Sequence, residues 1–211
     1  MKRWLPLAAM AVVLSWTAPA TANRPIRLGG LIISDTTAHD FDCLFGDQCQ
    51  TARAAKQVST ITLPAGVTGT ATFETNTVLG SGSVPGSGKT GYAYRVDMSK
   101  AVSGEEVACV TDVTVELGPI TQLKYDGNLL ADVFVVTQGG LGTVNIYSAV
   151  TTGNLTTFTF DRPLCAGDGT NPGLASFYFG VASIHPPKPV SVNLGWPGLV
   201  PISVDARAPG H

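Results

Sequence analysis

The chain alternates apolar and polar residues over most of its length beyond residue 57. In the stretch 113–117, Val113, Val115 and Leu117 fall on one face, and Thr114 and Glu116 fall on the other. This period of two is typical of a half-buried β-strand. Comparable short runs, rich in β-branched and aromatic residues, occur at 58–63, 70–75, 92–97, 133–136, 144–147, 157–160, 176–183, 190–194 and 200–204.

Turn residues separate these runs at intervals of about 8–12 residues. Asp126-Gly127 predicts a tight hairpin, and Gly139-Gly140, Thr152–Asn154 and Gly195–Gly198 each break one apolar run from the next. We therefore predict an all-β fold, a single antiparallel β-sandwich of the jelly-roll or Greek-key kind with about 10–12 strands. An outer-membrane barrel would need longer strands and aromatic girdles, whereas aromatic residues make up only 8% of this chain.

A few segments depart from the strand pattern. The stretch 51–56 predicts one or two helical turns, 80–88 is a Gly/Ser-rich surface loop, and 185–189 is a proline-rich stiff connector. Lys89 follows that Gly/Ser loop, but Ser83 stands where a phosphate-binding loop requires glycine. The apolar segment 24–33 is the best candidate for an edge strand, or for a strand donated to another chain.

The first 22 residues have the pattern of a cleavable secretory signal. A basic start at Lys2-Arg3 precedes an apolar run over 4–16, and Ala20-Thr21-Ala22 supplies the small residues of a cleavage site. The apolar run is shorter than the roughly 20 residues that span a bilayer. We expect residues 23–211 to form one secreted domain, located outside the cell, on its surface or in the periplasm.

Charge and composition narrow the partners of this mature chain. Loss of Lys2 and Arg3 changes the formal net charge from −2 to −4, with 15 acidic residues remaining. Without a basic stripe, a nucleic-acid partner is not expected. No second long apolar stretch follows, so we expect no membrane insertion after cleavage. Only 13% of residues are charged, which is typical of exported proteins with Thr- and Gly-rich strands.

Four cysteines lie in the mature chain: Cys43, Cys49, Cys109 and Cys165. An even number in an exported chain indicates two disulfides, for which three connectivities exist. We predict Cys43–Cys49, because the two are close in sequence, and Cys109–Cys165, because both sit in strand-like surroundings. A zinc site would need closely spaced cysteine pairs such as C-x2-C, and the sequence has none. We expect no cofactor.

An acidic segment surrounds the first two cysteines. Asp40, Asp42 and Asp47 are close enough in sequence to suggest calcium. The calcium-binding hand pattern fails, because Phe45 occupies the position of its required glycine. A solvated acidic loop is the simpler interpretation, and calcium stays an alternative.

Aromatic residues suggest a possible sugar site. Trp196 lies in a Gly/Pro turn and is the one tryptophan that would survive signal cleavage, while Tyr92 and Tyr94 share a strand face. The competing interpretation places both tyrosines at the edge of the core and has Trp196 cap the end of the sandwich. The sequence contains no G-x-S-x-G nucleophile motif that could act with one of its histidines, His39, His185 and His211. A glycosidase needs only two suitably spaced carboxylates, so a secreted hydrolase stays open.

A resemblance is carried by Phe134–Thr137, Gly139–Gly142, Pro163–Gly167 and Ser176–Ser183. With these motifs the chain resembles uncharacterised secreted bacterial β-sandwich proteins of the exosortase-associated type, but it lacks their C-terminal anchor. The resemblance implies a secreted sandwich and brings no catalytic residues. We expect a non-enzymatic structural or adhesive protein that meets protein partners or itself through strand edges, with a carbohydrate-binding module as the first alternative and a hydrolase as the second.

Overall fold

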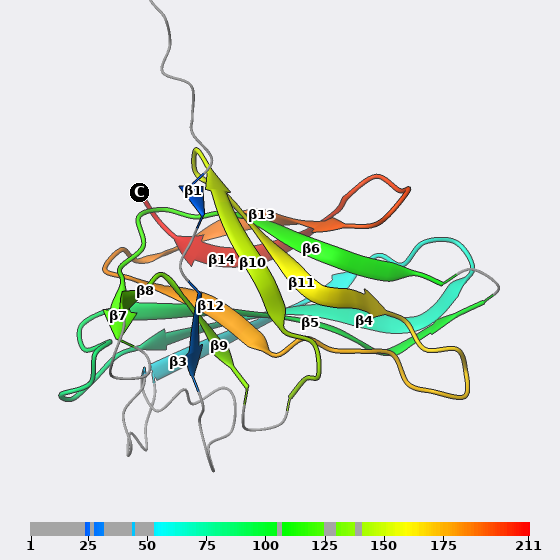
Figure 1. The fold of residues 1–211 in the computed structure, drawn as a ribbon, viewed down its shortest axis with the longest axis horizontal. Helices are drawn as coiled ribbons and strands as arrows, with labels where there is room; N and C mark the ends of the chain where they lie inside the picture. The colour runs from blue at the N-terminus through cyan, green and yellow to red at the C-terminus, as the bar shows by residue number, and fades with distance from the viewer. Residues whose placement is uncertain are drawn as a thin grey trace, which may run out of the picture.

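A computed structural model describes residues 24–25, 28–31, 44, 53–104, 107–124, 130–137 and 141–211. In this part of the chain the backbone is nearly all strand, and two six-stranded sheets pack face to face (Figure 1). The predicted all-β sandwich is therefore confirmed. No helix within these ranges has the length and apolarity to cross a bilayer.

Sheet A and sheet B, named here by their strand order, make up the two layers. Sheet A runs β1 (Arg24–Pro25), β10 (Ile146–Thr152), β11 (Leu155–Cys165), β6 (Cys109–Glu116), β13 (Pro187–Gly195) and β14 (Ile202–Pro209). Sheet B runs β2 (Leu28–Leu31), β9 (Val133–Val136), β12 (Tyr178–Ser183), β5 (Thr90–Ser103), β4 (Val67–Leu79) and β3 (Arg53–Ile61). A small ribbon of β7 (Leu123–Lys124) and β8 (Leu130–Ala131) adds a third pairing.

All pairings between these strands are antiparallel except that of β2 with β9, which is parallel. The 14 strands of the described ranges exceed the predicted number because β1, β7 and β8 are only two residues long. Such short pieces carry too few residues for an alternating pattern to be visible in the sequence.

Alternation along β6 shows how the sequence builds the core. Val113 and Val115 point into the sandwich and are fully buried, whereas Thr114 faces outward and shares a hydrogen bond of 2.9 Å with Thr157 of β11. Because successive side chains of a strand point to opposite faces, one residue in two reaches the core. The prediction for this strand is confirmed.

Aromatic rings from both sheets fill the centre of the core. Phe179 of β12 has its ring centroid 5.1 Å from Phe158, 5.9 Å from Phe160 and 6.0 Å from Tyr94. Phe73 stacks on Tyr94 with centroids 5.9 Å apart. These separations are typical of favourable aromatic pairs, so the rings tie sheet A to sheet B.

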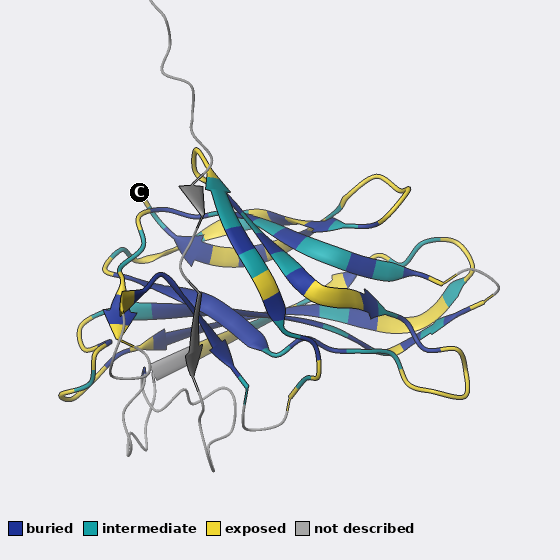
Figure 2. Cartoon of the chain, viewed as in Figure 1, coloured by how far each residue is buried: buried dark blue, intermediate teal, exposed yellow. Residues whose placement is uncertain are grey.

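Sheet B is buried on both faces, as the continuous dark blue of its central strands shows (Figure 2). Its outer face carries a second apolar cluster, to which the β7–β8 ribbon contributes Leu123 and Ala131. Leu44 also belongs to this cluster and is fully buried. A Cβ atom added at Gly91 would lie 2.3 Å from the end of the Leu44 side chain, so a larger residue there would require the leucine to shift.

Two sequence-based predictions are wrong in this region. The stretch predicted as helical turns becomes strand from Arg53 onward, because β3 pairs with β4 along its whole length. The stiff connector shortens, because β13 already begins at Pro187. Pro187 and Pro189 pair with β14, whereas β6 pairs only with residues 193–195. The prolines thus lie where one side of the strand needs no ladder hydrogen bond.

The predicted turns that fall in the described ranges are confirmed. Gly153 has a φ of 64° in the hairpin between β10 and β11, and Gly198 has a φ of 75° between β13 and β14. The Gly/Ser stretch 80–88 forms the loop between β4 and β5. The predicted turns at 126–127 and 139–140 lie outside the described residues.

Candidate functional site

The predicted disulfide between Cys109 and Cys165 is present. Cys109 begins β6 and Cys165 ends β11, and the two residues are register partners with Cα atoms 3.9 Å apart. The bridge therefore ties together two neighbouring central strands of sheet A at one end of the sandwich. Cys43, Cys49 and the calcium candidates Asp40, Asp42 and Asp47 lie outside the described residues.

The two tyrosines suggested as a sugar platform do not lie on the surface. Tyr92 and Tyr94 are both fully buried between the sheets. Tyr92 donates its hydroxyl to the His185 carbonyl at 2.7 Å, and Tyr94 donates to the Arg207 carbonyl at 3.1 Å. Burial raises the pKa of Tyr92 to about 12. Their shared face was read correctly, but it is the core face, since β5 lies in the middle of a sheet buried on both sides.

Trp196 also differs from the exposed stacking residue that the turn suggested. It is 5% exposed and belongs to the main core cluster. Within the described part of the chain its indole Nε1 is buried without a hydrogen-bond partner. Trp196 is among the residues that line a pocket of about 560 Å³ at the end of the sandwich.

The most exposed aromatic side chain in the described ranges is one that sequence reasoning missed. Tyr147 of β10 is 75% exposed. Ile146 pairs with Phe160 and Ser148 with Thr159, so Tyr147 is the extra residue of a β-bulge. The extra residue of a bulge changes the direction in which its side chain points, so the alternation of faces is interrupted there. For this reason, the alternating pattern in the sequence could not predict that Tyr147 is exposed.

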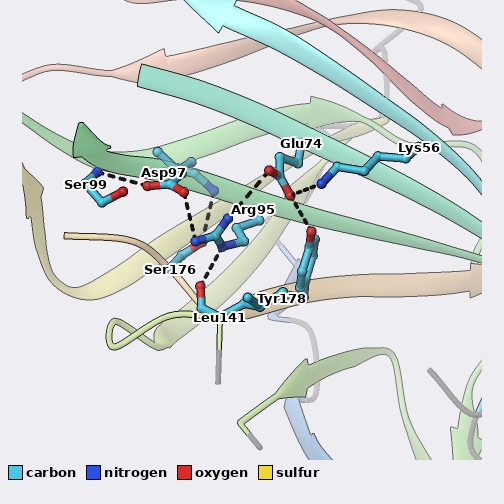
Figure 3. A network of polar contacts seen from close by, with 9 residues as sticks. Lys56, Glu74, Arg95, Asp97, Ser99, Leu141, Ser176 and Tyr178 are labelled. Atoms are coloured by element: carbon cyan, nitrogen blue, oxygen red, sulfur yellow. Dashed lines mark hydrogen bonds and ion pairs between the residues drawn. The ribbon is translucent and has the colours of Figure 1, made fainter. Parts of the chain in front are cut away.

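A polar network lies on the outer face of sheet B, and sequence reasoning did not find it. We use the term polar network for Lys56, Glu74, Arg95, Asp97 and Tyr178, which come from β3, β4, β5 and β12 (Figure 3). Glu74 and Arg95 are register partners on neighbouring strands, and each is only 8% exposed. Buried charges of this kind persist when they are paired.

The carboxylate of Glu74 is the centre of this network. Lys56 Nζ lies 3.1 Å from its Oε2, and Arg95 Nη1 lies 3.5 Å from its Oε1. The hydroxyl of Tyr178 donates a short hydrogen bond to the same Oε2. Burial, followed by the neighbouring Glu74 carboxylate, raises the pKa of Tyr178, so this hydroxyl stays protonated and serves as a donor.

Arg95 extends the network to a loop and to a second carboxylate. Its Nε donates to the Leu141 carbonyl at 2.6 Å, and its Nη2 lies 2.9 Å from Asp97 Oδ2. The guanidinium also lies over the Tyr178 ring, 5.9 Å from the centroid. Burial acts to raise the pKa of Asp97, but hydrogen bonds from Ser99 and the charge of Arg95 outweigh it, so this pKa is lowered.

The network is suited to holding strands together and poorly suited to catalysis. Glu74 is engaged by three donors, and Arg95 bridges its two carboxylates. A general acid needs a carboxyl pKa raised toward neutrality, and that of Asp97 moves the other way. Asn76 follows Glu74 by two residues on β4, its amide atoms are buried, and its side chain acts on the Tyr178 hydroxyl by lowering the pKa of that group. Within the described ranges, no group of three or more His, Cys, Asp or Glu side chains is placed to hold a metal ion.

The N-terminal edge segment, our name for β1 and β2, lies at the other side of the sandwich. β1 pairs antiparallel with β10, at Arg24 with Thr151 and Pro25 with Val150. Two residues later β2 pairs parallel with β9, at four positions from Leu28 with Val133 to Leu31 with Val136. The segment thus forms the last strand of both sheets. The edge-strand part of the prediction is confirmed for residues 24–25 and 28–31, and the rest of 24–33 lies outside the described residues.

Comparisons of this chain with protein-family models, with curated proteins and with solved structures found no match. Three features of the molecule bear on its function. These features are the N-terminal edge segment, the polar network and the pocket beside Trp196.

Proposed function

We propose that this chain is an exported, non-enzymatic structural or adhesive protein of a bacterial envelope or extracellular matrix. Copies join when the N-terminal edge segment of one copy pairs with the sheet edges of another. The observation that carries the proposal is the position of that segment, which forms the final strand of sheet A and of sheet B in immediate succession.

The N-terminal edge segment is held by few residue pairs. β1 makes two residue pairs and β2 makes four. The β2 pairing is parallel, and parallel pairing is slightly less stable per residue than antiparallel pairing. A segment held by so few pairs detaches more readily than a long hairpin strand.

β9 needs a partner strand on this edge. Its four residues, Val133–Val136, are all buried, and an uncovered edge of buried valine and phenylalanine would template pairing with another chain. The same ladder hydrogen bonds form whether the covering strand comes from the same copy or from a second one. Strand addition and exchange of an identical element are established routes to assembly.

The remaining features agree with a structural role. The charges of the polar network are paired with one another and connect β3, β4, β5 and β12. Such connections strengthen the sheet, and they leave no free carboxylate for catalysis. The carbohydrate-binding alternative draws no support from Tyr92, Tyr94 or Trp196, because all three are buried. The hydrolase alternative draws none from Glu74 and Asp97, because Arg95 neutralises both.

Sedimentation of the mature chain, residues 23–211, tests the proposal. We expect concentration-dependent oligomers and short filaments by electron microscopy. A matched control carries Leu31→Cys together with Val136→Cys, since these are register partners and their oxidation locks β2 onto its own β9. The oxidised control should stay monomeric, and reduction should restore assembly. A mature chain that stays monomeric at millimolar concentration contradicts the proposal.

A further inference from the structure

A cavity of about 400 Å³ lies at the edge of the sandwich that β1 and β2 cover. The residues that line it come from the chain after β6, from the β10–β11 hairpin, from the residue before β9 and from the C-terminus. We call it the Asp132 cavity, and its lining includes Leu117, Ile120, Asp132, Thr151, Thr156 and His211. It therefore brings together parts of both sheets at the place where the N-terminal edge segment passes from one sheet to the other.

Asp132 gives this cavity its charge. Its side chain belongs to a residue that is only 4% exposed, and Gln122 Nε2 donates to its Oδ1 at 3.0 Å. No other residue described in the lining is acidic, and the imidazole of His211 is directed to Glu116, with Nε2 3.4 Å from Oε1. Removing a carboxylate from water is costly, and an approaching cation offsets that cost. Asp132 is therefore suited to receive a positive charge.

The pairing of β1 with sheet A leads an arginine to this cavity. Arg24 is the register partner of Thr151 on β10. Thr151 lines the cavity together with Asp132, and its hydroxyl shares a hydrogen bond of 3.0 Å with that of Thr156. The strand that completes sheet A thus carries a basic residue at the register position beside the buried carboxylate.

The pairing of β2 with sheet B leads a second arginine to the same place. Leu28 and Val133 form the first pair of the parallel β2–β9 ladder. In the sequence Arg27 directly precedes Leu28, and Asp132 directly precedes Val133. Two paired parallel strands keep the same order of residues, so the register continued by one position sets Arg27 opposite Asp132.

Arginine is the cation that suits a single buried carboxylate. Its guanidinium is always charged and offers five donors in a planar fork, which can bind both oxygens of a carboxylate. Backbone pairing, by contrast, is the same for any extended strand, and the side-chain pockets of an acceptor edge decide which strand is accepted. A buried charge at such an edge can also fix the register of the incoming strand.

We propose that Asp132 determines which strand covers this edge, by binding the guanidinium groups of Arg24 and Arg27 that precede the apolar residues of β2. The inference rests on the proposed function, in which the covering strand comes from a second copy of this chain. The preferred partner is therefore a strand with basic residues directly before an apolar stretch. A strand with neutral or acidic residues at those positions pairs poorly.

A double-mutant cycle on the dilute, monomeric mature chain tests the charge pairing without any need for assembly. The cycle combines Asp132→Asn with a variant that carries both Arg24→Gln and Arg27→Gln. We expect the effects on the unfolding equilibrium constant to be coupled by at least about tenfold. In a matched cycle, Asp161→Asn on the exposed part of β11 replaces Asp132→Asn, and the coupling should be less than about twofold. Additive effects in the Asp132 cycle overturn the proposal.

A charge exchange between two chains tests the same pairing in assembly. One chain carries Arg24→Glu and Arg27→Glu, and the other carries Asp132→Lys. Each chain alone brings like charges together, so we expect its assembly to be at least about tenfold weaker than that of the wild type. Mixing restores opposite charges between copies, and native mass spectrometry should show oligomers that contain both chains.

The two levels of the account fail in different ways. A wild-type mature chain that assembles, combined with a mixture of the charge-exchanged chains that does not, overturns the role of Asp132 and leaves the proposed function intact. A wild-type chain that stays monomeric overturns the proposed function, and the coupling measured in the monomer then decides the role of Asp132 by itself.

Discussion

The two side edges of the sandwich are built in different ways. On one side the edge strands β3 and β14 belong to long hairpins, in which β3 pairs with β4 over nine residues and β14 pairs with β13 over eight. On the other side the edges are β1 and β2, with two and four pairs. The hairpin side also gains a bond across the layers, because Ser59 of β3 donates to the Asp205 carbonyl of β14 at 2.6 Å.

The difference fits the proposal that one edge stays closed and the other exchanges its covering strand between copies. A strand that continues a hairpin is held by its turn and by its neighbour in sequence. β1 and β2 come from the far N-terminal part of the chain, so their contacts form at a large cost in chain entropy. The polar network reaches the edge strand on the hairpin side, where Lys56 of β3 contacts Glu74 of β4, and it extends inward as far as Tyr178 of β12.

The largest effect is expected from breaking the polar network. Glu74→Ala leaves the Arg95 guanidinium with one carboxylate partner in a buried position, and we expect a loss of about 3–5 kcal/mol in unfolding free energy. Chemical denaturation of the mature chain measures this. Thr72→Ala, on the same strand and face but outside the network, should cost much less. Equal losses in the two variants would mean that the network does not hold this side.

Removal of the disulfide should rank second. Cys109→Ser combined with Cys165→Ser frees β6 from β11 at one end and should lower the unfolding free energy by about 2–4 kcal/mol. Because both strands lie inside sheet A, we expect assembly through the N-terminal edge segment to persist in this variant below its midpoint of unfolding. Loss of assembly in the still-folded variant would argue that the two regions are coupled.

Hydrogen exchange compares the two edges directly. Amides in the β2–β9 ladder should exchange at least about tenfold faster than those in the β3–β4 ladder, because exchange follows local opening. Native-state exchange of the mature chain under dilute conditions measures both ladders in one experiment. If β9 proves as protected as β4, an easily opened N-terminal edge is excluded.

The smallest effect is expected from acid. The pKa of Asp97 is lowered from its ordinary value of 3.8, so its contribution to stability is fully present above that pH and is lost as the pH falls through the lower folded value. Asp168, whose pKa is lowered to about 2 chiefly by the Asn171 backbone amide, acts in the same window. Asp97→Asn should flatten the pH dependence of stability only below about pH 4. An unaltered profile would show that Asp97 is not paired in solution.

The strands and the core were predictable because alternation is a local signal. Val113 and Val115 point into the main core as their spacing predicts, and so do Val133 and Val135 of β9. Tyr92 and Tyr94 were placed on one face correctly, but sequence alternation does not say whether a face meets solvent or a second layer. That information depends on the neighbouring strands, which come from distant parts of the chain.

The polar network lay beyond sequence reasoning for a related reason. Lys56, Glu74, Arg95 and Tyr178 are spread over four strands, and only the sheet register brings them together. In the sequence, Glu74 looked like an ordinary outward-facing residue, whereas Lys56 fell in the stretch predicted as helical turns. Tyr147 was missed because a β-bulge breaks the very alternation on which the prediction rests.

The central claim is that β2 of one copy can pair with β9 of another. Mixing two populations of the mature chain, one with Leu31→Cys and one with Val136→Cys, tests it most directly, because these residues are register partners. After mild oxidation, the account predicts a disulfide-linked dimer containing one chain of each kind on a non-reducing gel. Mixtures that contain only unlinked chains at concentrations where oligomers are present would contradict it.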